Sequence, residues 1–206
     1  MKTFDVPHYK QIKKDACGVA CARMLLGYYG FDVSEEELLS EVYMHKFGTW
    51  YSDLCKLFIR RGLHTKVKTI NINIYSPFWA DKDEKALRPL LLERQKVLKG
   101  LLKTETEKAI GYMDMGGKLT VQIPNLKMIE KLIMKQPTMI PVLRSFLNPK
   151  RIDEVGHYIV LNGFDGSKYS VLDPNGGKYE IEKEVLYYAW LANNRDSDGY
   201  LMEVTK

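Results

Sequence analysis

The order of two hydrophobic periodicities along the chain most constrains its fold. In the first third, apolar residues recur at helical spacing in three segments, over about 17–30, 34–42 and 51–61. From residue 63 the pattern alternates as in a strand, and short strand-like runs follow at 138–146, 158–164, 169–172 and 179–181. A short helical pattern at 126–133 precedes these runs, and an aromatic-rich helical pattern around Trp190 follows them. The chain therefore predicts an α+β fold, with an N-terminal helical half built on a central buried helix and a C-terminal antiparallel β half.

Length and hydrophobic content favour a single domain over residues 1–206. The chain has 206 residues, 45% of them hydrophobic, which is enough to bury one proper core. Between the two halves, leucines recur at helical spacing with charged residues between them, so we expect a helical insertion at about 77–117. Packing of this segment on the body is the simpler interpretation, and a lid or a dimer contact is the alternative.

Charge and cysteine usage exclude several classes of protein. The formal charge of +5 is modest and its lysines and arginines alternate with acids, so we expect no nucleic-acid partner. No stretch approaches the roughly 18 apolar residues of a membrane span, and the start lacks an apolar signal segment, so we expect a cytoplasmic protein. Three cysteines without framework spacing indicate reduced thiols. We expect no metal and no cofactor, and the oligomeric state stays open.

Cys17 stands where a polar, lysine-bearing approach turns into the first helical segment. The first N–H groups of a helix have no intrahelical partner, and the helix dipole places positive charge at that end. Both favour a thiolate, which is the nucleophilic form of cysteine. Cys17 is therefore the candidate nucleophile.

His157 and Asp173 flank a predicted β-hairpin. The sequence between them reads as two strands joined by a three-residue loop at 165–167, with Gly166 available for a positive φ. An odd loop places the imidazole and the carboxylate on one face of adjacent strands, opposite or diagonal to each other. An even loop would place them on opposite faces unless a β-bulge resets the register.

Together, the candidate residues predict nucleophilic acyl chemistry. Cys17 supplies a nucleophile, His157 a base, and Asp173 a group that orients the base. The backbone N–H of Cys17 and the side-chain amide of Gln11 are the predicted donors to the oxyanion. A cysteine hydrolase acting on a peptide or related amide is the favoured function. Two alternatives are an acyltransferase or transpeptidase with the same thioester, and a non-catalytic peptide-binding module.

These residues carry a resemblance to a known family. The matching features are Gln11, Cys17-Gly18, the helix ending at Tyr28-Tyr29-Gly30, Gly156-His157, Asp173-Pro174 and the closing helix with Trp190. The chain resembles the papain-like cysteine peptidases of the bacteriocin-leader-processing type, especially their stand-alone relatives. The resemblance implies a papain-like fold and a peptide or protein substrate. It implies Cys17 as nucleophile, His157 as general base and acid, Asp173 as orienting group and Gln11 as oxyanion donor.

Overall fold

The protein, represented by a computed structural model, has helices and two β-sheets, and the predicted α+β class is confirmed. The structure describes residues 2–46, 48–80, 82–147, 150, 155–193 and 199–206. Its α-helices are α1 (Cys17–Tyr28), α2 (Glu35–Glu41), α3 (Tyr51–Ile59), α4 (Glu84–Val97), α5 (Gly100–Asp114), α6 (Leu126–Ile133) and α7 (Lys183–Asn193). Its strands are β1 (Lys2–Thr3), β2 (His64–Thr69), β3 (Lys118–Val121), β4 (Thr138–Leu143), β5 (Gly156–Phe164), β6 (Lys168–Asp173), β7 (Gly177–Glu182) and β8 (Tyr200–Thr205).

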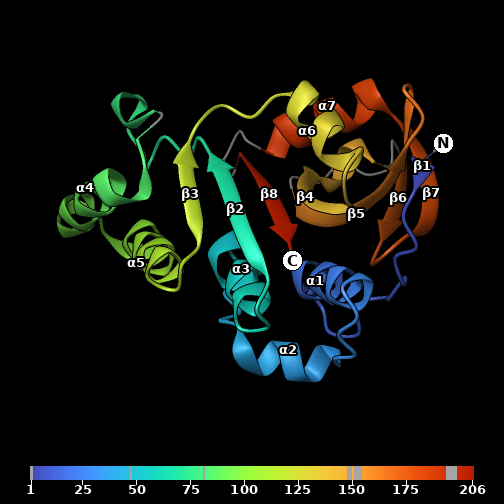
Figure 1. Cartoon of the computed structure of the whole chain (residues 1–206), viewed down its shortest axis with the longest axis horizontal. Helices are drawn as coiled ribbons and strands as arrows, with labels where there is room; N and C mark the ends of the chain where they lie inside the picture. Colours follow the sequence, from blue (N-terminus) through green and yellow to red (C-terminus); the bar gives the residue numbers. More distant parts are fainter. Residues whose placement is uncertain (1, 47, 81, 148–149, 151–154, 194–198) are drawn as a thin grey trace.

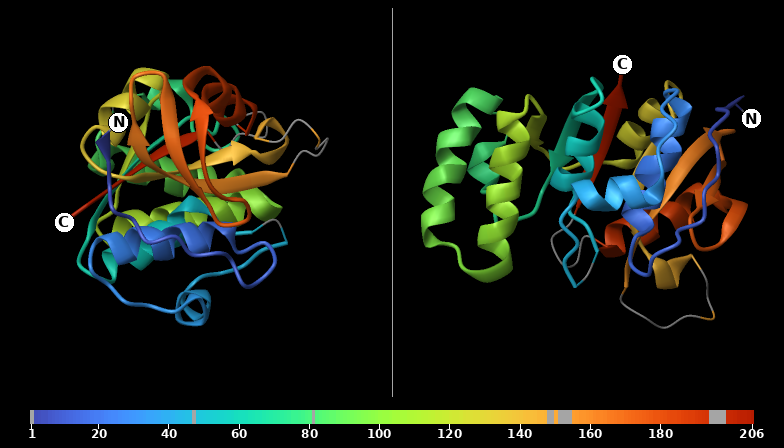
Figure 2. Two further views of the ribbon diagram at one scale, coloured as in Figure 1. Left: turned by 90° about the vertical axis from the view of Figure 1, so that its right-hand side faces the viewer. Right: turned by 90° about the horizontal axis from the view of Figure 1, so that it is seen from below.

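The larger sheet forms the predicted antiparallel half. Its strands run in the order β1-β5-β6-β7. Strand β4 pairs with residues 156–161 of β5, and β1 pairs with residues 163–164 of the same strand. Helix α1 lies against one face of this sheet and α6 and α7 lie against the other (Figures 1 and 2). Side chains such as Val160 and Leu172 pack toward α1, whereas Ile140 and Ile159 pack toward α6 and α7. The sheet is therefore buried on both faces, which explains its continuous apolar runs.

The smaller sheet has the order β3-β2-β8 and departs from the prediction in one pair. Strand β8 is antiparallel to β2, but β3 is parallel to it, with Val67 opposite Leu119. Parallel neighbours require a long crossover connection. The chain between β2 and β3 provides that connection through α4 and α5, so this part of the β structure is not antiparallel as expected.

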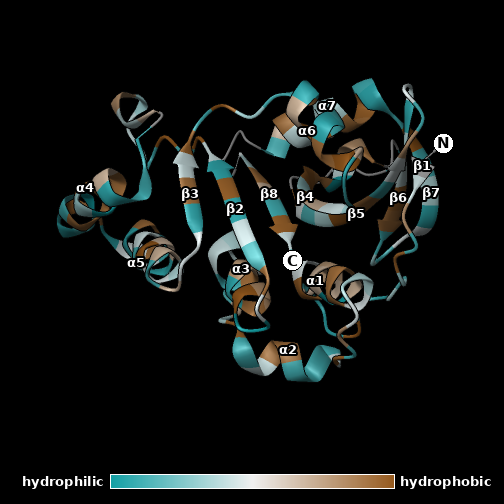
Figure 3. Cartoon of the chain, viewed as in Figure 1, coloured by the Kyte–Doolittle hydropathy of each residue, from teal (hydrophilic) through white to brown (hydrophobic). Residues whose placement is uncertain are grey.

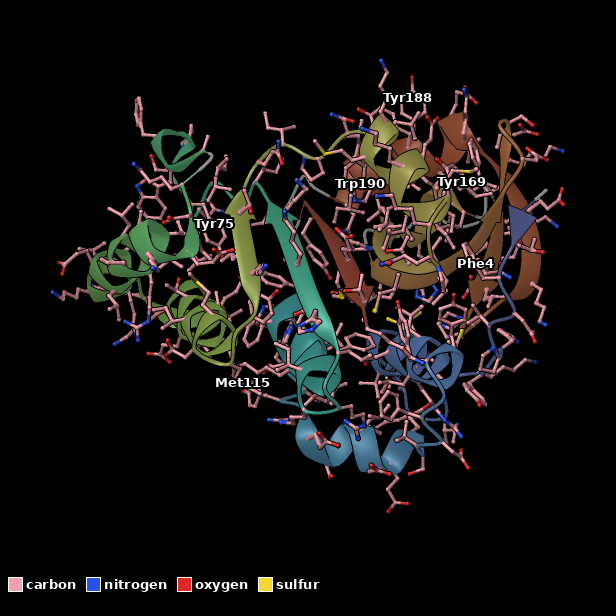
Figure 4. All side chains as sticks on the ribbon, in the orientation of Figure 1. Phe4, Tyr75, Met115, Tyr169, Tyr188 and Trp190 are labelled. Atoms are coloured by element: carbon pink, nitrogen blue, oxygen red, sulfur yellow. The ribbon has the colours of Figure 1, made fainter. Side chains whose placement is uncertain are left out.

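Two helices occupy most of the 77–117 segment and lie side by side at one end of the molecule (Figure 1). Helix α5 contacts the body through Lys108, whose Nζ lies 3.3 Å from the Asp53 carboxylate on α3. Tyr112 is fully buried, and its hydroxyl donates to the Thr65 carbonyl at 3.1 Å. Figure 4 places Tyr75 near these helices and Met115 at the end of α5. The segment is thus a helical hairpin packed on α3 and β2.

Two hydrophobic clusters form the core. One joins α1, α3, α4 and α5 to β2, β3, β8 and one face of the larger sheet. The other lies between the opposite face of that sheet and α6 and α7, and it contains Tyr169 and Trp190 (Figure 4). Buried and more exposed residues alternate along β2, as expected for a strand that buries one face, whereas Tyr200, Leu201 and Met202 at the start of β8 are all buried. Figure 3 colours both strands by hydropathy. The predicted central helix is confirmed, because eight of the α1 residues are buried.

Candidate active site

Cys17 is the first residue of α1, as predicted, and its side chain is half-buried. No side chain caps the N-terminus of α1, where the preceding residue is Ala16. The first turn, all of which the structure describes, holds no acidic residue. The positive end of the helix dipole is therefore not neutralised locally, and it acts on the Cys17 sulfur and on any anion that forms beside it.

His157 and Asp173 contact each other directly. His157 Nε2 lies 2.8 Å from Asp173 Oδ1, and both residues are nearly buried, at 3% and 7% exposure. Because Nε2 faces the acid, the other ring nitrogen, Nδ1, is available to a nucleophile. The pairing of a carboxylate with one imidazole nitrogen orients the ring and stabilises its protonated form.

The hairpin reaches this contact by a different route from the predicted one. Phe164 pairs with Tyr169, so the connection has an even number of residues, and the predicted three-residue loop is wrong. A register shift between Leu161 and Gly163 compensates, and Val160 then pairs with Leu172. Continuing that register along β6 places Asp173 diagonally across from His157 on the same face of the sheet. A β-bulge adds one residue to one strand and so restores the face that the even loop would have reversed.

The carboxylate of Asp173 is held by several donors besides His157. The Asn175 N–H donates to Oδ1 at 2.7 Å, and the Tyr179 hydroxyl donates to Oδ2 at 3.2 Å. His8 Nε2 also lies 2.9 Å from the Asp173 carbonyl oxygen. These bonds fix the acid in position, and sequence reasoning missed Tyr179 because it lies on the next strand, β7.

His157 and Asp173 shift each other's pKa. Burial disfavours the imidazolium, but hydrogen bonds to Asp173 and Cys17 outweigh burial and raise the pKa of His157 to about 9. Burial likewise raises the pKa of the Asp173 carboxyl, but its hydrogen bond to His157 outweighs that effect and holds the pKa below its usual value. The arrangement therefore favours a protonated His157 beside a charged Asp173 at neutral pH.

Gln11 lies in the loop that leads into α1. Its backbone N–H donates to the Pro174 carbonyl at 3.0 Å, which ties this loop to the strand end that carries Asp173. Its side-chain Nε2 donates to the Lys13 carbonyl at 3.1 Å. Its Oε1 is buried and has no hydrogen-bond partner among the described residues. The loop thus lies next to the Cys-His-Asp group, with the amide donor directed at its own loop rather than at Cys17.

Cys17 and His157 line one cleft of about 440 Å³. Its walls also include residues just before and within the start of α3, the facing ends of β4 and β5, and the end of α7. Helix α5 contributes Leu101, Leu102 and Glu105 to the wall. Sequence reasoning did not assign these residues to the site, because their helical spacing favoured packing on the body over the alternative of a lid. The segment that connects β2 to β3 therefore borders the candidate active site.

Two further observations concern other kinds of site. A smaller hollow of about 280 Å³ between β2, α6 and β8 is lined by Lys66, Lys68, Lys131 and Lys135, among others, away from Cys17 and His157. Within the described ranges, no group of three or more His, Cys, Asp or Glu side chains is arranged to hold a metal ion. Nor does any helix in those ranges have the length and apolar character needed to cross a membrane.

A cysteine at the N-terminus of a buried helix, in one cleft with a His-Asp pair on an antiparallel sheet, resembles the site of papain-like cysteine peptidases. The comparisons agree with this class. Residues 5–88 match the model of the peptidase C39 family. The resemblance stated from the sequence, to bacteriocin-leader-processing peptidases, is confirmed by this match and by the structural neighbours. Comparison with curated proteins finds no match.

Three solved structures share the fold. One is a double-glycine-motif protease from an AMS/PCAT transporter in complex with the leader peptide, with 17% identity, TM-score 0.53, and coverage of 98% of this chain and 93% of that chain. The second is the peptidase domain of Streptococcus ComA, a bifunctional ABC transporter involved in quorum sensing, with 13% identity, TM-score 0.53 and coverage of 100% and 98%. The third, a C39-like peptidase from Bacillus anthracis, has 14% identity, TM-score 0.54 and coverage of 100% and 98%.

Proposed function

We propose that the protein hydrolyses a peptide bond through a Cys17-His157-Asp173 triad and a thioester intermediate. The observation that carries this proposal is the 2.8 Å contact of His157 with Asp173 at a cleft that Cys17 also lines. The helix N-terminus, the raised pKa of His157 and the buried acid each serve the same chemistry.

The proposed reaction begins when the Cys17 thiolate attacks the carbonyl carbon of the scissile bond. A C–S bond forms, and the carbonyl electron pair moves onto oxygen. As the C–N bond breaks, His157 gives its proton to the leaving amine. The neutral imidazole then takes a proton from water, which attacks the thioester and releases the acid product and the thiolate. Asp173 holds the ring in one orientation throughout and stabilises its charged form.

The oxyanion would be held by the backbone N–H of Cys17 and by the side-chain amide of Gln11. Support for the second donor comes from the position of Gln11, whose backbone is bonded to Pro174 beside the triad acid. Its amide donates to Lys13 in the free protein, so binding of substrate would replace that single hydrogen bond. We expect Gln11→Ala to lower kcat by about 10²-fold or more, the usual cost of losing one oxyanion donor.

A peptide segment is the proposed substrate. The solved double-glycine-motif protease holds a leader peptide, and Cys17 and His157 of this chain share a cleft of about 440 Å³ in which a peptide bond could reach both side chains. Three free cysteines, including the reactive candidate, fit the cytoplasmic location expected from the sequence. Digestion of a peptide library would identify the residue preference at the cleaved bond.

The experiment is a peptide-library digestion followed by mass spectrometry. The library contains double-glycine sequences among randomised ones, and the wild-type protein is compared with Cys17→Ala and with Cys21→Ala as the matched control. Cys21 lies one turn further along α1 and is fully buried, so it is not expected to react. We expect new peptide termini from wild type and Cys21→Ala, and none from Cys17→Ala.

The same digestion separates hydrolysis from the alternatives. Amine acceptors are added in a second series, and products that carry the acceptor in place of a free carboxylate would assign the protein to acyl transfer. Cleavage that persists in Cys17→Ala would show that the nucleophile is assigned wrongly. Peptides that bind to wild type without being cleaved would support a binding module instead.

A further inference from the structure

Glu35 is a buried carboxylate at the start of α2 that the reaction does not use directly. It is only 2% exposed. Its Oε1 accepts hydrogen bonds from the backbone N–H groups of Ile12 and Lys13, at 3.0 and 2.9 Å. Its Oε2 lies 3.0 Å from the Ile12 nitrogen as well. A charged acceptor makes such bonds stronger than neutral ones, so this contact joins α2 firmly to the loop before Cys17.

Capping and charge at the start of α2 do not explain why the Glu35 carboxylate is buried. Ser34 already caps the helix, because its hydroxyl oxygen accepts from the Glu37 N–H at 3.0 Å. The two following glutamates, Glu36 and Glu37, supply negative charge to the same turn and remain exposed. Burying a third carboxylate costs free energy unless it is well bonded. The bonds made by Glu35 are directed at the loop, which lies 22 and 23 residues earlier in the chain.

The loop that Glu35 holds is the one that carries Gln11 to Cys17. The backbone of Lys13 is its centre: the N–H donates to Glu35, and the carbonyl accepts from Gln11 Nε2 and from the Ala16 N–H at 3.3 Å. Ala16 is the residue directly before Cys17. Glu35 is therefore linked through the backbone of Lys13 to the Gln11 amide and to the residue that precedes Cys17.

The loop also contains a backbone conformation that needs support. Asp15 has φ of 64°, in the left-handed region, which costs free energy for a residue other than glycine. Such a conformation persists only where the surrounding contacts determine it. The Pro174 carbonyl holds the start of the loop through the Gln11 N–H, and Glu35 holds its middle. Apart from these two contacts, the hydrogen bonds that the described residues make within the turn at 13–16 are local, such as that of the Ala16 N–H with the Lys13 carbonyl.

We propose that Glu35 is a positioning residue that holds the 11–16 loop so that Gln11 and the Cys17 N–H meet the oxyanion. This inference rests on the proposed peptidase function. Glu35 touches neither substrate nor reacting atoms, and its effect passes through the backbone N–H and carbonyl of Lys13. Small displacements of a donor reduce transition-state stabilisation strongly, and about 1 Å can cost 10²-fold in rate. Loss of Glu35 should therefore lower the rate of acylation more than it lowers the rate of any reaction of Cys17 that forms no oxyanion.

The test compares Glu35→Gln with the exposed neighbour substitution Glu36→Gln. Glutamine keeps the size of the side chain and one acceptor oxygen, but its amide group faces a backbone N–H that the carboxylate accepted. Three quantities are measured: kcat/KM on a peptide from the library digestion, the inhibition constant of the aldehyde of its acyl product, and the rate of Cys17 alkylation by iodoacetamide. The aldehyde forms a tetrahedral adduct that uses the oxyanion site, whereas alkylation displaces iodide and forms no oxyanion.

For Glu35→Gln we expect kcat/KM to fall by about tenfold or more and aldehyde binding to weaken in parallel, while alkylation stays within about twofold of wild type. Glu36→Gln should leave all three unchanged. Equal losses in alkylation and turnover would show a general structural role and overturn the proposal, and so would wild-type values for all three.

A double substitution tests whether Glu35 acts through the loop that carries Gln11. If it does, Glu35→Gln adds less in the Gln11→Ala background than in wild type, because a shared contact is then already lost. Fully multiplicative losses would contradict this coupling. Should Glu35→Gln fail to fold, Glu35→Asp keeps the charge, and the same ratio of turnover to alkylation decides. Failure of the proposed function itself would appear separately, as no cleavage of any library peptide by wild type, or as cleavage that survives Cys17→Ala.

Discussion

Replacing Asp173 by asparagine removes the charge beside His157 while keeping the shape of the side chain. Asparagine Oδ1 can still accept from His157 Nε2, where the acid now makes its 2.8 Å contact, so the ring keeps an orienting partner. What the substitution removes is the largest of the effects that outweigh burial and raise the pKa of His157 to about 9; the hydrogen bond to Cys17 remains. Because burial, which lowers the pKa, remains as well, we expect the pKa to fall to about 6.5, the unperturbed value.

The size of the effect follows from the fraction of His157 that is protonated. At pH 8.5, a pKa of about 9 leaves about three quarters of the imidazole charged, whereas a pKa of about 6.5 leaves about 1%. At pH 6.5 the corresponding fractions are nearly all and about half. If activity needs the imidazolium beside the thiolate, Asp173→Asn should lower kcat/KM by about twofold at pH 6.5 and by about 75-fold at pH 8.5.

The assay is the pH profile of kcat/KM for wild type and Asp173→Asn on one cleaved peptide, with the His157 titration followed by NMR. The alkaline limb of the profile should move from near pH 9 to about pH 6.5, together with the NMR titration. A loss of the same factor at every pH would refute the reasoning, because it would show that Asp173 acts through orientation or folding rather than through charge.

Three other substitutions or conditions give separate tests. Gly176→Ala places a Cβ 2.9 Å from Asp173 Oδ2, so we expect kcat to fall about tenfold with an unchanged melting temperature; an unchanged kcat would contradict this. Gly117→Ala places a Cβ 2.0 Å from the buried Tyr112 ring, so urea unfolding should show a loss of about 3 kcal/mol in the free energy of unfolding; an unchanged free energy would contradict this. The pKa of His157 is raised on folding, so its stabilisation is complete below about pH 6.5 and is lost as the pH rises toward 9. Wild type should therefore lose about 3 kcal/mol more of unfolding free energy than His157→Gln between pH 6 and 9.5, and equal losses would refute the assignment.

Much of the fold was predictable because local rules and burial agree in it. The helix that begins at Cys17 was expected to be central from its apolar residues, and α1 is indeed the central buried helix. Strands β4 to β7 of the larger sheet lie at about the expected positions, whereas β1 was not predicted. The parallel pairing of β2 with β3 was not predictable, since it depends on how α4 and α5 carry the chain back across the molecule, and periodicity carries no information about strand direction.

The site shows the same division between local and long-range information. The sequence indicates the chemical types of Cys17, His157 and Asp173, and it restricts the hairpin to two registers. The loop length was wrong, and only the β-bulge near Leu161 restores the predicted contact. The sequence did not single out Glu35, because its partners lie on a loop that only the folded chain brings to α2.

The most direct test of the account is the rate at which iodoacetamide modifies Cys17 between pH 5 and 9, in wild type and in His157→Ala. The modified residue is located by peptide mapping, and Cys21 and Cys55 serve as internal controls because both are fully buried and burial raises the pKa of each thiol. The account predicts rapid labelling of Cys17 alone at pH 6.5 in wild type, and labelling slower by tenfold or more in His157→Ala. Equal Cys17 labelling rates in the two proteins across the pH range would contradict a thiolate stabilised by His157 and, with it, the proposed catalytic centre.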